Sequence, residues 1–170
     1  MRGDEFMVSF YHSTVQKGVI LVGEELQKRK RVKKVLTGNG HPLSITDYNS
    51  KLVVNYQPDV YFKLRNNKKM IFEILDSEEQ KQDIIIADVI RSFLVEDVDS
   101  LIFIYKGDEE VEMRIIESLV TISMGLVYKG IPQNELPFGK SGVIRITKKQ
   151  AMSPENVKRE ILKRRFSNIK

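Results

Sequence analysis

The sequence PDVYFKLRNNKKMIFEIL, which spans residues 58–75, decides the fold. Two stretches rich in β-branched and aromatic residues, 59–64 and 69–75, flank a polar segment that contains Asn66 and Asn67. Asparagine tolerates a positive φ and favours turns, so we expect the two stretches to pair as an antiparallel hairpin. Asp59 opens the first strand and Glu73 lies inside the second, so each of two adjacent strands carries one carboxyl group.

The connection between the strands decides whether these two carboxyl groups can meet. Side chains alternate between the faces of a strand, and directly opposed residues of an antiparallel pair point to the same face. Asp59 and Glu73 therefore share a face only if paired positions sum to an even number. A two-residue Asn66–Asn67 turn would pair 65 with 68, an odd sum. If the two carboxyl groups form one site, the connection must have three or five residues or contain a bulge, and we predict such a connection.

Glu73 stands among apolar neighbours, in the order Ile-Phe-Glu-Ile-Leu. A carboxylate in such surroundings costs several kcal/mol unless it meets water, a cation or a metal, or lies on an exposed strand face. Asp59 follows Pro58 and could serve only as a turn or strand-entry residue. The sequence leaves both alternatives open.

The rest of the chain alternates helical and extended patterns. Apolar spacing predicts helices over 11–36, 78–94 and 108–124, and Ser153-Pro154-Glu155 opens a last helix. Further strands are predicted at 43–45, 51–56, 101–105, 126–128 and 143–146. This order predicts an α/β fold with a mixed central sheet flanked by helices. We expect one domain over 1–150, with 151–170 as an appended basic helix.

Composition narrows the classes of protein further. The chain has 170 residues, of which 41% are hydrophobic and 30% charged, and no apolar run approaches the ~18 residues of a membrane span. The absence of cysteine excludes disulfides, thiolate zinc sites and a cysteine nucleophile. Acids near Met1 replace the bases of a signal peptide. We expect a soluble, cytoplasmic protein without a membrane partner.

Basic residues are clustered rather than spread. The chain carries 28 lysines and arginines against 23 acids, a formal net charge of +5. Clusters of this kind bind phosphate backbones, although lysine-rich helix faces are often merely solvated. We predict DNA contacts from two segments. The first comprises Lys28, Arg29, Lys30, Arg31, Lys33 and Lys34. The second is the C-terminal tail, which contains Lys158, Arg159, Lys163, Arg164, Arg165 and Lys170, and its candidate contact residues are Lys163, Arg164 and Arg165.

Residues 11–105 resemble the PD-(D/E)XK nuclease superfamily, with its restriction-endonuclease-like or archaeal Holliday-junction-resolvase-like core. The element order (a helix, a three-stranded meander, a helix and a strand) carries the resemblance, together with acids on adjacent strands at Asp59 and Glu73. The resemblance implies an α-β-β-β-α-β core. It also implies that Asp59 and Glu73 hold Mg²⁺ (or Mn²⁺), which prefers hard oxygen ligands. On the first helix, Glu25 is preferred over Glu24 as a further ligand.

The family's lysine, two positions after the second acid, is replaced here by Leu75. We expect Lys81, at the start of the following helix, to supply the amine, with Lys63 and Lys69 as weaker candidates. His12 and His41 have no partner at metal-binding spacing, and we expect them on the surface or in loops.

The leading hypothesis is a DNA-binding, magnesium-dependent endonuclease that hydrolyses phosphodiester bonds with Asp59, Glu73 and Lys81 as catalytic residues. A homodimer would suit cleavage of both strands of a duplex. The alternative is a catalytically inactive nuclease-fold module that binds nucleic acid or a protein partner without cleavage. A third hypothesis treats the basic segments as solubilising surface on a protein that makes protein–protein contacts.

Overall fold

The computed structural model describes residues 9–46, 53–76, 81–132 and 141–165. None of the helices in these ranges is both long enough and apolar enough to cross a membrane. The elements, in chain order, are α1 (Phe10–Lys28), β1 (Val32–Leu36), β2 (Leu43–Thr46), β3 (Val53–Tyr56), β4 (Val60–Leu64), β5 (Lys69–Leu75), α2 (Gln82–Leu94), β6 (Val98–Tyr105), α3 (Glu109–Tyr128), β7 (Gly142–Arg145), a 3-10 turn (Gln150–Met152) and α4 (Pro154–Arg165).

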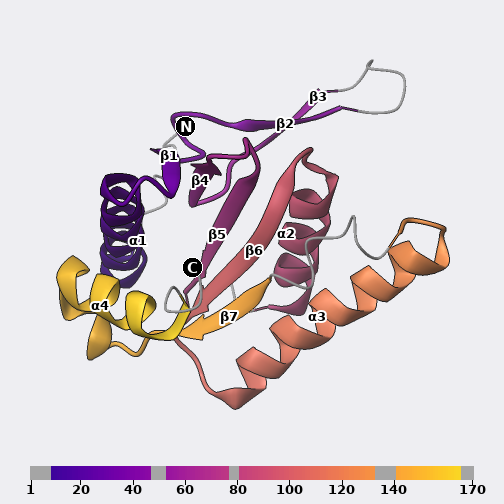
Figure 1. Ribbon diagram of the computed structural model, residues 1–170. Coiled ribbons are helices and arrows are strands. Elements are labelled where there is room, and N and C mark those ends of the chain that lie inside the picture. Colours follow the sequence, from indigo (N-terminus) through magenta and orange to yellow (C-terminus); the bar gives the residue numbers. More distant parts are fainter. Residues whose placement is uncertain (1–8, 47–52, 77–80, 133–140, 166–170) are drawn as a thin grey trace, which may run out of the picture.

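A mixed five-stranded sheet in the order β1-β4-β5-β6-β7 forms the centre of the molecule. The β1–β4 and β4–β5 pairs are antiparallel, whereas β5–β6 and β6–β7 are parallel. Strands β2 and β3 form a separate two-stranded hairpin between β1 and β4 in the chain. Figure 1 shows α1 and α4 on one side of the sheet and α2 and α3 on the other. The predicted α/β class with a mixed sheet flanked by helices is confirmed.

Each face of the sheet has its own apolar core. On one face Val15, Val19 and Val22 of α1 pack with Val157 and Ile161 of α4 against even-numbered strand residues, among them Phe62, Phe72 and Ile104. On the other face, α2 and α3 cover odd-numbered residues, which include Ile71, Leu75, Phe103 and Tyr105. Helices cover both faces of β6, which explains why residues 101–105 of this strand are all apolar.

The β4–β5 hairpin has the predicted connection. Val60 pairs with Phe72 and Lys63 with Lys69, so paired positions sum to 132, an even number. Leu64 N–H donates to the Lys68 carbonyl over 2.8 Å, which leaves a three-residue loop, and Asn67 takes a positive φ of 64°. The same register places position 59 opposite position 73. The prediction of an odd-length connection is therefore confirmed.

The first helix ends earlier than the sequence predicted. Helix α1 stops at Lys28, Lys30 adopts a positive φ of 60°, and residues 32–36 form β1 instead of continuing the helix. The predicted helix over 11–36 is wrong beyond Lys28, because Val32 is buried where it pairs with Leu64 of β4. Pairing with a distant strand here outweighs local helical spacing.

The strand predicted at 126–128 is also wrong, because these residues form the last turn of α3. The turn closes at Gly130, whose φ is 95°, and Ile131 N–H donates back to the Leu126 carbonyl over 3.1 Å. This is the Schellman geometry, in which glycine accepts the left-handed conformation after a helix. The β-forming side chains of Val127 and Tyr128 therefore lie on a helix.

Helix α4 packs closely on α1. Val157 and Ile161 are fully buried, and Ser153 Oγ accepts the Asn156 N–H over 3.2 Å as the N-cap. Gly18 lies at the crossing of the two helices, where an added Cβ would come within 2.5 Å of the Val157 side chain and 3.0 Å of the Pro154 carbonyl. The close approach of α1 and α4 therefore requires glycine at position 18.

We predict that Gly18→Ala lowers the free energy of unfolding by about 1–3 kcal/mol, the usual cost of overpacking. The matched control is Gly125→Ala in α3, where no atom lies within 4 Å of the added Cβ. Because alanine favours a helix over glycine by about 1 kcal/mol, that variant should be unchanged or more stable. Urea unfolding followed by circular dichroism measures both changes, and equal stability of the two variants would contradict the assigned helix crossing.

Candidate functional site

Glu73 is a buried carboxylic acid in the middle of the sheet. Its side chain is 7% exposed and lies on the same face of β5 as Ile71 and Leu75, under α2. The Tyr56 hydroxyl, from β3, donates a hydrogen bond to Glu73 Oε1. The Tyr56 oxygen also lies 2.8 Å from Ser92 Oγ of α2. Glu73 is thus enclosed by hydrogen-bonding side chains from two other elements.

Burial changes the acidity of this group. Desolvation raises the pKa of Glu73 well above its usual value, and the negative charges of Asp59 and Asp88 raise that pKa further. Burial, followed by the charge of Glu73, also raises the pKa of Tyr56. The Glu73 carboxyl therefore tends to keep its proton, since the charged form lacks water and faces two other acids.

Asp59 lies immediately before β4, where the β5 backbone has no β4 partner. Its Oδ2 accepts the Ile74 N–H over 2.7 Å, and its Oδ1 lies 2.9 Å from His12 Nε2 of α1. Gln16 of the same helix donates to the Asp59 carbonyl over 3.0 Å. Asp59 therefore joins the ends of β4 and β5 to the first turns of α1. The two predicted acids therefore lie close together, since the register sets position 59 opposite position 73 and Asp59 binds the backbone of the next residue, Ile74.

His12 was missed as a site residue by the sequence analysis. The expectation that it lies on the surface or in a loop is wrong, because it sits in α1 with a side chain only 14% exposed. His41 is exposed, as expected, and its carbonyl accepts the Tyr61 hydroxyl over 3.1 Å. No sequence spacing connects residue 12 to residue 59. Only the packing of α1 on the sheet brings them together.

The structure does not bring the remaining predicted residues to this pair. Glu25 lies on α1 thirteen residues after His12, about 20 Å along the helix, and binds Arg29 and Lys158 instead. Lys81 is exposed and precedes α2; none of its described contacts is with either acid. The helix start predicted at 77–78 lies outside the described residues.

The amine expected after the second acid has no replacement among the described neighbours of Glu73. Leu75 is 2% exposed and packs in the apolar core beside Tyr105. Lys63 and Lys69 pair with each other across the hairpin, and Lys69 Nζ donates to the Glu96 carbonyl over 2.7 Å. Lys69 is four strand residues from Glu73, about 13 Å. Both weaker lysine candidates therefore lie at the far end of the hairpin.

A second polar cluster, also missed, lies on the α1 face at the ends of β5 and β6. Asp76 binds Lys106 and the hydroxyl of Ser9, the N-cap of α1. Lys106 Nζ also lies 5.1 Å from the centre of the Tyr11 ring. Burial, followed by the charge of Asp76, raises the pKa of Tyr11. The sequence held a signal for the pair, because both residues directly follow parallel strands, whose ends meet at one edge.

Among the described residues, Asp59 and Glu73 are not part of a larger cluster of metal-ligating side chains. Within residues 9–46, 53–76, 81–132 and 141–165, no group of three or more histidine, aspartate or glutamate side chains is arranged to hold a metal ion. Magnesium usually keeps several waters and is held by one or two carboxylates, which is the number that Asp59 and Glu73 could supply. Glu73 is enclosed and tends to keep its proton, so it would have to lose that proton before it could bind a cation.

The two basic segments, in contrast, come together. Glu25 of α1 lies 2.9 Å from an Arg29 nitrogen and 3.5 Å from Lys158 Nζ of α4. Hydrogen bonding from Arg29, followed by the charge of Lys158, lowers the pKa of Glu25, so it stays ionised and joins the two segments. The residues from Lys28 to Lys34 lie on the end of α1, the following turn and β1, where all six basic residues are exposed.

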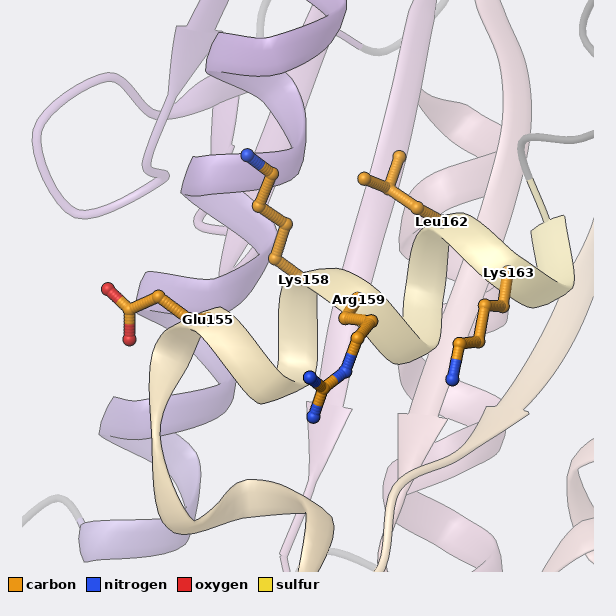
Figure 2. Close-up of a pocket in the computed structure, with 5 residues that line it drawn as sticks. All are labelled: Glu155, Lys158, Arg159, Leu162 and Lys163. Carbon is orange, nitrogen blue, oxygen red and sulfur yellow. The ribbon is translucent and has the colours of Figure 1, made fainter.

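Helix α4 adds a shallow hollow to this surface. Figure 2 shows the side chains of Lys158, Arg159 and Lys163 around it, with Glu155 and Leu162. The hollow has a volume of about 540 Å³, and three of its five lining residues are cationic. The side chains of Arg164 and Arg165 lie outside the described residues. Of the predicted second segment, Arg159 and Lys163 are exposed and Lys158 is half-buried.

We predict that Glu73→Gln removes a pH dependence of stability. The unfolded carboxyl ionises near pH 4.3. Because the native pKa is higher, the native state holds the proton more tightly. The wild type is therefore fully stabilised below about pH 4.3 and loses stability as pH rises toward the native pKa, by about 1.4 kcal/mol per pH unit. The glutamine side chain of the variant does not ionise. The free energy of unfolding of the variant, relative to that of the wild type, should therefore increase as pH rises.

Urea unfolding between about pH 4 and pH 8 measures this difference. The matched control is Glu96→Gln, which removes the same charge from an exposed position between α2 and β6. Its profile should follow that of the wild type. A constant offset between Glu73→Gln and the wild type across this range would contradict the assignment of a buried acid with a raised pKa.

Comparison of the chain with protein-family models, with curated proteins and with solved structures finds no match. These comparisons therefore provide no relative from which the role of a residue could be transferred to this chain. The roles of Asp59, Glu73 and the basic surface follow from their chemistry and geometry alone.

Proposed function

We propose that this protein binds nucleic acid through a basic surface built on a restriction-endonuclease-like core. The order of α1, then the antiparallel β1, β4 and β5, then α2 and the parallel β6 supports this core assignment. The β2–β3 hairpin is then an insertion between the first two strands of the meander. Two acids at opposed register positions, Asp59 immediately before β4 and Glu73 on β5, add to the likeness.

One observation carries the binding proposal: the Glu25 link between Arg29 and Lys158. The two basic segments are separated by more than a hundred residues in sequence, yet α1 and α4 hold them side by side. A purely solubilising role does not require two basic segments to lie side by side. Binding of a polyanion does, because several cations must contact neighbouring phosphates. Lys28, Arg29, Lys33, Lys34, Arg159 and Lys163 are each exposed on these two segments.

Binding without cleavage is favoured over hydrolysis. Leu75 stands where the family has its lysine, and Glu73 is closed off by Tyr56 and Ser92. Hydrolysis with Mg²⁺ or Mn²⁺ is the second candidate, because Asp59 and Glu73 do converge from adjacent strands. The third candidate function is protein binding, in which the basic surface only keeps the protein soluble. That function predicts no salt-sensitive affinity for nucleic acid.

We predict that the protein binds labelled duplex and single-stranded DNA or RNA with a steep dependence on salt. Each phosphate contact contributes about −0.9 to the slope of log K against log salt on a duplex. The double variants Lys33→Ala/Lys34→Ala and Arg159→Ala/Lys163→Ala should each make the slope shallower by about 1 to 2. Fluorescence anisotropy at several salt concentrations measures the slope.

The matched control is Lys81→Ala/Arg91→Ala, which removes the same charge from exposed positions before and within α2, on the other side of the sheet. This control should keep the wild-type slope. If all three double variants lose affinity equally, net charge alone governs binding. If none of them does, the α1–α4 surface is not the interface.

We predict that bound plasmid, junction and single-stranded DNA stay intact with Mg²⁺ or Mn²⁺. Gel electrophoresis of the wild type, Asp59→Asn and Glu73→Gln gives the measurement. Cleavage by the wild type that is lost in both variants would overturn binding without cleavage and establish the second candidate function. Cleavage that survives both substitutions indicates a contaminant or another site.

A further inference from the structure

Helix α3 has two apolar faces, and the sheet covers only one of them. Val111, Ile115 and Leu119 are buried in the core beneath α3. On the other face, Met113 is 52% exposed, Ile116 37%, Met124 68% and Val127 42%. Figure 1 shows α3 as the outermost helix on its side of the sheet. A second, uncovered apolar stripe therefore runs along the outside of the molecule.

Half-buried Val120 completes the stripe, which then comprises residues 113, 116, 120, 124 and 127. The successive spacings of three, four, four and three residues keep the side chains in one line, over about 21 Å of helix. Isolated exposed apolar residues are ordinary, but a contiguous line at this spacing is typical of a helix–helix seam.

The order of the spacings indicates which partner fits the stripe. The spacings of three, four, four and three residues are the same in both directions along the helix, and Val120 is the central residue. In an antiparallel pair of α3 helices related by a two-fold axis at Val120, Met113 faces Val127 of the other copy and Ile116 faces Met124. Every member of the stripe then meets another apolar member. A two-fold interface requires such self-complementarity.

The charges at the ends of α3 favour the same arrangement. The first turn carries Glu109, Glu110, which pairs with Arg114, and Glu112, which accepts the Tyr105 hydroxyl, and the C-cap is Lys129. An antiparallel pair brings the acidic first turn of one copy to the Lys129 end of the other and opposes the two helix dipoles. A parallel pair would place the three acids of each copy together. The same acids would repel a phosphate backbone or an anionic membrane surface.

We propose that this stripe is the interface between two copies of the chain, which pair through antiparallel α3 helices about a two-fold axis at Val120. The proposal does not depend on nucleic-acid binding, because α3 and the α1–α4 surface lie on opposite sides of the sheet.

The oligomeric state of the full chain is the first test. Light scattering after size exclusion should give twice the chain mass of 19.7 kDa for the wild type. Ile116→Glu should give a monomer, because it sets two carboxylates against apolar side chains of the other copy. The matched control is Met152→Glu, at a 66% exposed position away from α3, which should remain dimeric. Circular dichroism shows whether each variant is folded. A monomeric wild type at micromolar concentration overturns the proposal.

Cross-linking tests the geometry separately from stability. The chain contains no cysteine, so each introduced cysteine is the only one. Val120→Cys lies on the proposed axis and should give a disulfide-linked dimer on oxidation. Met113→Cys should not, because its two copies would lie about 21 Å apart along the helix. A mixture of Met113→Cys and Val127→Cys should cross-link again. The two-fold axis at Val120 is rejected if Val120→Cys gives no disulfide-linked dimer. It is also rejected if Met113→Cys on its own cross-links as well as Val120→Cys does.

Discussion

The register of the β4–β5 hairpin is the constraint on which the candidate site depends. Three loop residues and the positive φ of Asn67 close the hairpin so that paired positions have an even sum. A slip of one residue would turn every β5 side chain to the opposite face. Phe72 and Ile74 would leave the core under α1, and Glu73 would enter it without Tyr56 or Ser92. The apolar packing of both faces and the position of one carboxyl group are therefore fixed by the same turn.

Local signals explain what the sequence could predict and where it failed. Apolar periodicity was sufficient for β5, β6 and the start of α3. The expectation that Asp59 and Glu73 form one site, together with the alternation of side chains, was sufficient to predict the odd-length connection of three residues. The segment after Lys28 was misassigned because its lysines and arginines carry no information about burial, and Val32 becomes a strand residue only through distant Leu64. The partners of the acids, His12 and Tyr56, depend on where α1 and β3 pack, which no local pattern encodes.

The two sides of the sheet differ in what they present to the outside. Helices α1 and α4 carry cations and are joined through Glu25, whereas α3 carries an apolar stripe with an acidic first turn. A dimer through α3 would leave both α1–α4 surfaces uncovered and facing away from the axis. Two basic surfaces in one particle would engage separate stretches of one polyanion, which raises the effective concentration of the second contact. The apolar and basic surfaces can thus act together without sharing a residue.

The chemistry around Glu73 shows why the acids and the basic surface need separate explanations. A carboxylate used to hold a metal must be ionised when the metal arrives, and its ionisation is opposed here by burial and by the charges of Asp59 and Asp88. With Leu75 in place of a cationic neighbour, the hydroxyl of Tyr56 satisfies the acid instead, as a hydrogen bond satisfies any buried polar group. Glu25, by contrast, is kept ionised by Arg29 and Lys158, and it lies on α1 about 20 Å along the helix from His12, the partner of Asp59. The ionised carboxylate that organises cations is therefore the one between the basic segments, and not the one inside the sheet.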